Sequence, residues 1–179
     1  MKVQQHKKHL LIIFMAGFLI GILYTNIISR QYITVSGIFN EYYLRQYVNT
    51  EVIAAEYIWY ILPMRAGPFI ALAVLGYTKL KKIAVIGYLL WTGFSVGVIA
   101  VSAVIQMGMR GILLFIVGII PQFIFYILAY TIVLWYLYTY PDAKWNSGKT
   151  TFVFLTLVMG ILMEVYVNPG LMRMFIQTL

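Results

Sequence analysis

The sequence predicts an all-α, polytopic integral membrane protein that forms a single membrane domain with about five transmembrane helices. Hydrophobic residues make up 63 % of its 179 residues and charged residues only 10 %, whereas a soluble domain carries about a quarter charged residues. Several uncharged runs are long enough to cross a hydrocarbon core of roughly 30 Å. The chain contains no cysteine, which excludes disulfides, iron–sulfur clusters and cysteine nucleophiles.

The apolar runs define the expected elements in chain order. A tail at residues 1–9 comes first. The expected spans are residues 10–28, 57–78, 83–107, 111–140 and 150–167. Pro63 and Pro68 in the second span predict a kinked entry. The fourth span is too long for one straight crossing and contains Pro121, so we expect either one bent helix or a half-helix followed by a helix.

Residues 29–56 are the only long stretch of mixed polarity, and we expect them to form an external segment. Asn40 is suited to start a helix there, and Tyr43 and Tyr47 lie four residues apart, near one helical face. An amphipathic helix at the membrane surface fits this pattern. A tethering loop that packs on the other helices fits it equally well.

The distribution of charge predicts the orientation. With five spans, one side of the membrane holds all eight lysines and a single acid, Asp142, whereas the five arginines and four glutamates lie on the other side or in its half of the membrane. The positive-inside rule then places the N-terminus in the cytoplasm and the C-terminus outside. Scattered cations between apolar runs indicate topology, so we expect membrane lipid as a partner and no nucleic acid.

Charged residues inside spans are costly in lipid and need a partner or water. Arg65 in the second span and Glu164 in the fifth lie at comparable depth. We therefore predict an ion pair that fastens these two helices; the alternative is that each side chain extends separately to the outer interface.

Further polar or small residues lie near the ends and breaks of spans. Gln122 directly follows Pro121, where its amide can satisfy a carbonyl that the proline leaves free, or contact a ligand or partner; Gln106 admits the same two interpretations. The candidate structural or partner-contact residues are Arg65, Glu164, Arg110, Gly111, Pro121, Gln122, Asn168 and Pro169.

Two glycine pairs have the spacing that lets helices approach closely. Gly17 and Gly21 lie in the first span, and Gly93 and Gly97 in the third. Such pairs pack helices within one chain or between two copies, so a homo-oligomer is an open alternative.

The supply of catalytic groups is small. Both histidines, His6 and His9, lie in the lysine-containing tail, and no metal-binding, nucleophile-elbow or dinucleotide motif occurs. Ser147-Gly148-Lys149-Thr150 ends like a phosphate-binding loop but lacks the upstream glycine. We expect no catalytic residues, no metal and no cofactor.

Three short stretches carry a family resemblance. The run from Arg110-Gly111-Ile112-Leu113-Leu114-Phe115 to Pro121, the ending Glu164-Val165-Tyr166-Val167-Asn168-Pro169, and Leu75-Gly76-Tyr77-Thr78 are similar to signatures of the stage II sporulation protein M family. The resemblance covers roughly residue 56 to the C-terminus, and the number of spans agrees. After the proline, however, this chain has Gln122, Phe123 and Tyr126 where that family commonly has His, Gly and, further on, Glu, so it resembles a divergent member.

The resemblance implies a non-enzymatic, multi-pass component of the bacterial plasma membrane that anchors peptidoglycan-degrading partners during engulfment of the forespore. The leading hypothesis is therefore a scaffold whose external surface, formed by residues 31–56 and the turns around Arg110 and Asn168, recruits protein partners. The runner-up is a small transporter or permease subunit in which the break at Pro121, with Gln122, Arg65 and Glu164, lines a polar cavity. An embedded enzyme is third, because hydrolysis or group transfer needs a positioned acid–base set.

Overall fold

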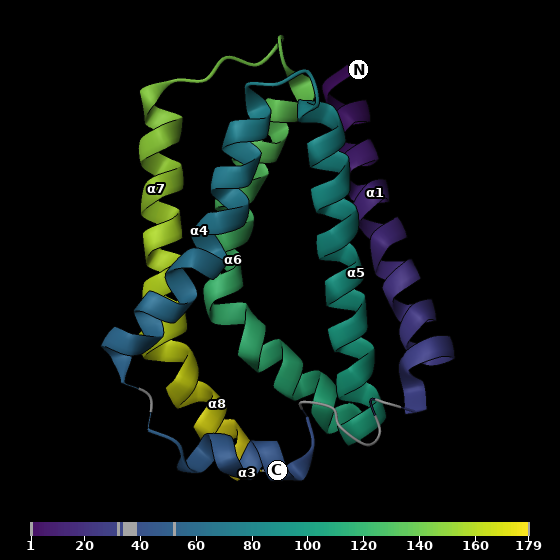
Figure 1. Cartoon of the computed structure of the whole chain (residues 1–179), viewed down its shortest axis with the longest axis vertical. Helices are drawn as coiled ribbons and strands as arrows, with labels where there is room; N and C mark the ends of the chain where they lie inside the picture. Colours follow the sequence, from purple (N-terminus) through teal and green to yellow (C-terminus); the bar gives the residue numbers. More distant parts are fainter. Residues whose placement is uncertain (1, 32, 34–38, 52, 179) are drawn as a thin grey trace. The chain divides into compact units, whose positions relative to one another are not determined.

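The computed structural model of the chain describes residues 2–31, 33, 39–51 and 53–178. Residues 32, 34–38 and 52, which belong to the predicted external segment, lie outside the described residues, as do the two terminal residues. Every regular element in the described ranges is helical (Figure 1). The elements are α1 Lys2–Tyr24, η1 Thr25–Ser29, α3 Glu41–Asn49, α4 Ala54–Gly76, α5 Lys81–Met107, α6 Met109–Thr139, α7 Ser147–Leu162, η2 Met163–Val167 and α8 Asn168–Gln177.

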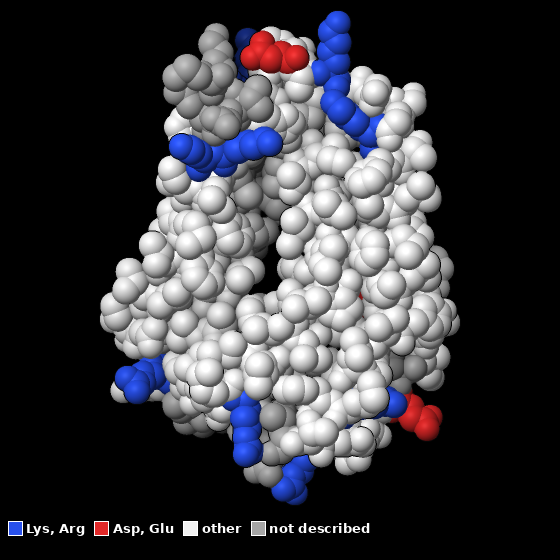
Figure 2. Space-filling view, turned by 180° about the vertical axis from the view of Figure 1, so that it is seen from behind, with Lys and Arg blue, Asp and Glu red and all other residues white. Residues whose placement is uncertain are grey.

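Five helical stretches are long and apolar enough to cross a membrane, which confirms the predicted fold class. The chain is a multi-pass membrane protein. These stretches are His6–Ile28, Ala54–Gly76, Lys81–Met107, Met109–Thr139 and Ser147–Gln177. Most of the surface in view in Figure 2 is uncharged, and large apolar side chains such as Ile27, Trp91 and Phe154 are more than 60 % exposed. Such a surface suits contact with lipid.

Three predicted boundaries differ from the structure. The tail expected at residues 1–9 is helical from Lys2 onward. The fourth span is one continuous helix through Pro121, so the alternative of a half-helix followed by a second helix is wrong. The last span was expected to end at residue 167, but the helical path continues through Pro169 to Gln177. Pro169 lies in the first turn of α8, where a missing N–H is tolerated, and the wider π turn of η2 precedes it.

The chain forms two compact units. Unit 1 comprises residues 1–50, 86–117 and 173–179, and unit 2 comprises residues 51–85 and 118–172.

In unit 1 the two glycine pairs face each other. A Cβ on Gly17 or Gly21 would collide with the backbone of α5 at Leu90 and Phe94, and one on Gly93 or Gly97 would collide with the backbone of α1. The glycines therefore let α1 and α5 touch backbone to backbone. Both glycine pairs therefore pack helices within one chain, which is one of the two alternatives that the sequence left open.

In unit 2, α6 runs antiparallel to the last helical stretch. A Cβ on Gly160 would lie 2.6 Å from the ring of Tyr126, whereas the nearest atom to a Cβ on Gly118 is the sulfur of Met172, at 3.1 Å. These two contacts fix the register between α6 and the last helical stretch. The part of α6 around Gln122 therefore lies opposite residues 164–168. At one end of the unit, Gly76 of α4 packs against the side chain of Leu137 on α6.

Candidate functional site

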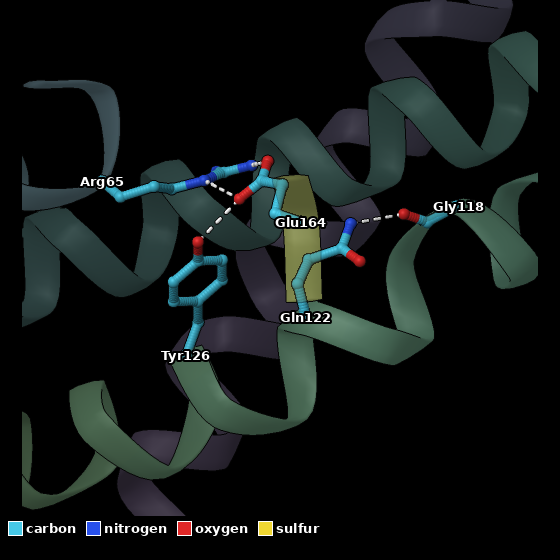
Figure 3. A network of polar contacts seen from close by, with 5 residues as sticks. All are labelled: Arg65, Gly118, Gln122, Tyr126 and Glu164. Carbon is cyan, nitrogen blue, oxygen red and sulfur yellow. Dashed lines mark hydrogen bonds and ion pairs between the residues drawn. The ribbon is translucent and has the colours of Figure 1, made fainter. Parts of the chain in front are cut away.

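The predicted ion pair between Arg65 and Glu164 is present in unit 2 (Figure 3). Arg65 Nε of α4 donates to Glu164 Oε2 at 2.9 Å, and Arg65 Nη2 donates to Glu164 Oε1. The Glu164 side chain is 7 % exposed, whereas the Arg65 side chain is 32 % exposed. A two-point contact of this kind holds both planar groups in one orientation. The alternative, in which each side chain extends to the interface alone, is wrong.

Two tyrosines of α6 complete the cluster around this pair. Tyr126 Oη donates to Glu164 Oε2 at 2.7 Å, and Tyr130 Oη donates to the carbonyl oxygen of Arg65 at 2.8 Å. The guanidinium carbon of Arg65 also lies 5.1 Å from the ring centre of Tyr126 and 5.8 Å from that of Phe123. Three helical elements, α4, α6 and η2, are thus joined through polar side chains that lipid would not solvate. We name this set of residues, Arg65, Tyr126, Tyr130 and Glu164, the polar cluster.

Tyr126 and Tyr130 are not among the predicted site residues, although the sequence contains a signal for them. Gln122, Tyr126 and Tyr130 follow one another at four-residue intervals, which places them on one face of a helix. That face carries the only amide in the predicted fourth span. A polar stripe on an otherwise apolar span marks the side that faces other helices rather than lipid.

Gln122 lies one turn from Tyr126 and is 3 % exposed. Its Nε2 donates to the carbonyl oxygen of Gly118, four residues earlier (Figure 3). The amide therefore does bond a backbone carbonyl next to the proline, but the carbonyl that the Pro121 ring leaves without an N–H partner is that of Val117. Among the described residues, Gln122 Oε1 and Asn168 Oδ1 are buried oxygens without a hydrogen-bond donor.

The remaining candidates lie elsewhere in the two units. Arg110 is exposed and lies with Gly111 in the first turn of α6, in unit 1. A Cβ on Gly111 would collide with the backbone of Ala103, so this glycine permits the close turn between α5 and α6. Pro169 is buried at the start of α8 in unit 2. Arg110 and Gly111 therefore do not belong to the polar cluster.

A second arrangement, in unit 1, involves the predicted amphipathic helix α3. Asn40 is its N-cap, as the sequence predicts, and its side-chain oxygen accepts from Tyr42 N. On one side of α3, Gln106 of α5 accepts from Phe39 N at 2.7 Å and donates to the Ile33 carbonyl. On the other side, Arg173 donates to the Thr50 carbonyl.

These tethers fix the segment on both sides of α3 and leave part of the helix exposed. Tyr42 is 69 % exposed and Tyr43 49 %, and Arg45 is exposed as well. Tyr47 is half-buried instead; burial raises its pKa, and the nearby charge of Arg173 opposes that shift. Tyr47 therefore belongs to the packed side of α3, whereas Tyr42, Tyr43 and Arg45 offer the accessible surface.

The charged and hydroxyl groups of the polar cluster bond mainly to one another. Within the described parts of the chain, no three His, Asp or Glu side chains lie close enough to share a metal ion. Both carboxylate oxygens of Glu164 already accept hydrogen bonds from Arg65, and one of them also from Tyr126. The cluster is suited to fastening helices.

Comparisons of the chain with protein-family models, curated proteins and solved structures give no match. The resemblance to the stage II sporulation protein M family therefore stays a prediction from the short sequence motifs.

Proposed function

We propose that the chain is a non-enzymatic membrane scaffold that recruits a protein partner through α3, outside the lipid. In this proposal the N-terminus lies in the cytoplasm and the C-terminus outside a bacterial plasma membrane, as the lysine distribution favours. A reporter fused after Leu179 should then read out as external, and a cytosolic signal would contradict the orientation.

The observation that carries the proposal is the state of α3. This helix lies outside the five candidate spans, and polar contacts from Gln106 and Arg173 hold the chain next to both of its ends. Fixing a short helix in advance lowers the entropy lost when a partner binds. Its accessible residues, two tyrosines and one arginine, are types enriched at the centres of protein interfaces.

The polar cluster supports the non-enzymatic part of the proposal. Its charged and hydroxyl groups bond to one another, and this arrangement joins α4, α6 and η2 rather than presenting a reactive group. The cluster keeps the spans of unit 2 together. Recruitment is assigned to α3.

The sequence resemblance names the class of partner to test first, which is a peptidoglycan-degrading enzyme acting during forespore engulfment. The test is recovery of partners from solubilised membranes by the tagged full-length chain. The double variant Tyr42→Ala/Arg45→Ala should lose most of the recovered partner. The matched control is Tyr60→Ala, which removes a 63 % exposed tyrosine from α4.

Equal recovery by the α3 variant, its control and the unaltered chain would contradict the proposal. So would a loss of partner only when Tyr60 is changed, because this residue belongs to a span. The purified chain should show no catalytic turnover.

The second candidate function is a small transporter or permease subunit. The buried oxygen of Gln122, which lacks a donor in the described structure, favours a polar path beside the Arg65–Glu164 pair. Flux of ions or small polar solutes in liposomes containing only this chain, abolished by Gln122→Leu, would support this candidate. Absence of flux with intact partner recovery would support the scaffold.

A further inference from the structure

Two turns meet at one end of unit 2. The first joins α4 to α5 at residues 77–80, and the second joins α6 to α7 at residues 140–146. They are adjacent because Lys81 Nζ lies 3.1 Å from the centre of the Tyr140 ring, and because Gly76 packs on Leu137 just below them. Both turns are at the upper end of this unit in Figure 1.

Five lysines flank these turns and contribute most of the charge there. The only acid among residues 77–82 and 140–150 is Asp142. We name these lysines the lysine rim: Lys79, Lys81, Lys82, Lys144 and Lys149. Lys79, Lys82 and Lys144 are exposed, whereas Lys81 rests on Tyr140 and Lys149 Nζ donates to the Lys144 carbonyl. The contacts of Lys81 and Lys149 hold part of the rim in place.

Aromatic side chains lie among these lysines. Tyr77 is 95 % exposed, Tyr140 43 % and Trp145 36 %. The indole of Trp145 is held by a 2.8 Å hydrogen bond to Thr150 Oγ1 and by the Tyr136 ring, whose centre is 5.0 Å away. Tyrosine and tryptophan with a polar end and an apolar body prefer the headgroup level of a membrane.

We propose that the lysine rim is a binding site for anionic phospholipid, in which the lysine ammonium groups contact the phosphate and the aromatic residues contact the glycerol and upper acyl region. Four helices of the candidate spans begin or end at these turns, so the rim lies where headgroups lie. A zwitterionic headgroup has no net charge, so it is attracted only weakly to the lysine rim. An anionic headgroup is attracted more strongly with each lysine that lies near it. The inference does not depend on the proposed recruitment by α3.

The experiment is native mass spectrometry of the full-length chain taken from nanodiscs with equal amounts of phosphatidylglycerol and phosphatidylcholine. The double variant Lys79→Gln/Lys144→Gln removes one exposed lysine from each turn. The matched control Lys7→Gln/Lys8→Gln removes two exposed lysines from α1, in unit 1. We expect the ratio of retained phosphatidylglycerol to phosphatidylcholine to fall about tenfold in the rim variant and to change little in the control.

Equal loss in both variants would overturn the proposal, because it would show general attraction between a basic protein and an acidic membrane. Unchanged retention in the rim variant would overturn it as well. Inorganic phosphate added at millimolar concentration tests the second source of the same chemistry. Displacement of the retained lipid by phosphate alone would assign the rim to a free anion instead.

Discussion

Unit 1 and unit 2 hold their helices together by opposite means. In unit 1, α1 and α5 approach until their backbones touch, through Gly17, Gly21, Gly93 and Gly97. In unit 2, α4, α6 and η2 are joined by an ion pair and two tyrosine hydroxyls. Apolar surface gives helices little reason to associate in lipid, so a membrane chain must use close packing or polar contacts.

The two units should therefore respond to different kinds of substitution. The glycine contact fails when volume is added, whereas the polar cluster fails when one partner is removed. Substitutions in both units test this contrast, and the predicted loss of stability decreases from the first one to the last.

Arg65→Met should be the most damaging change, because it leaves the buried Glu164 carboxylate without its cation. Removing one member of a buried pair costs about 3 to 5 kcal/mol. Thermal unfolding of the purified chain in detergent measures the loss. The double variant Arg65→Met/Glu164→Leu should recover most of the stability, because no charge then remains buried. A single variant as stable as the unaltered chain would show that the pair does not fasten these helices.

Gly93→Ala should separate α1 from α5, because the added Cβ collides with the backbone at Phe14 and Phe18 rather than with a movable side chain. Overpacking of this kind costs about 1 to 3 kcal/mol, again measured by thermal unfolding. Gly87→Ala is the control on the same helix, because a Cβ there has open space. It should leave the chain as stable or slightly more stable, since alanine favours a helix. Equal losses at both positions would rule out the backbone contact.

Tyr126→Phe should cost about 1.5 kcal/mol, because it removes one hydrogen bond to a charged carboxylate that Arg65 still bonds, and it keeps the ring beside Arg65. Tyr130→Phe removes a bond to a neutral carbonyl and should cost less, about 1 kcal/mol. The two variants are compared by denaturant titration. A larger loss of stability in Tyr130→Phe than in Tyr126→Phe would mean that the Tyr126 hydroxyl stabilises the Glu164 carboxylate only weakly.

Gly76→Ala should have the smallest effect, below about 1 kcal/mol. The added Cβ meets only Leu137 Cδ2, at 2.7 Å, and this end of a leucine side chain can rotate away. Thermal unfolding of Gly76→Ala and of Gly93→Ala under the same conditions compares the two losses of stability. A loss as large as that of Gly93→Ala would show that the distinction between backbone and side-chain contact does not hold.

Much of this architecture could be predicted from the sequence. The five spans follow from apolar runs, the start of α3 from the capping ability of Asn40, and the Arg65–Glu164 pair from the cost of an isolated charge in lipid. These features depend on local composition or on an energetic penalty large enough to allow few solutions.

The rest depends on contacts that single-sequence patterns do not contain. Whether the glycine pairs met within one chain or between copies could not be decided, because spacing alone does not name the facing helix. Asn168 and Pro169 suggested the end of the last span, yet the π turn before them lets the helix continue to Gln177. The tyrosines of the polar cluster were missed because their distance from Arg65 and Glu164 in sequence hides their closeness.

The turn between α5 and α6 also determines how this protein can be engineered. Gly108 alone separates the two helices, with a φ of 60° that disfavours other residues, and Gly111 lies against α5 one turn later. An epitope or fluorescent reporter inserted there would force this helical hairpin apart. The connection at residues 140–146 is longer and mostly exposed, so it is an internal position at which sidedness can be assayed with less disturbance of the helices.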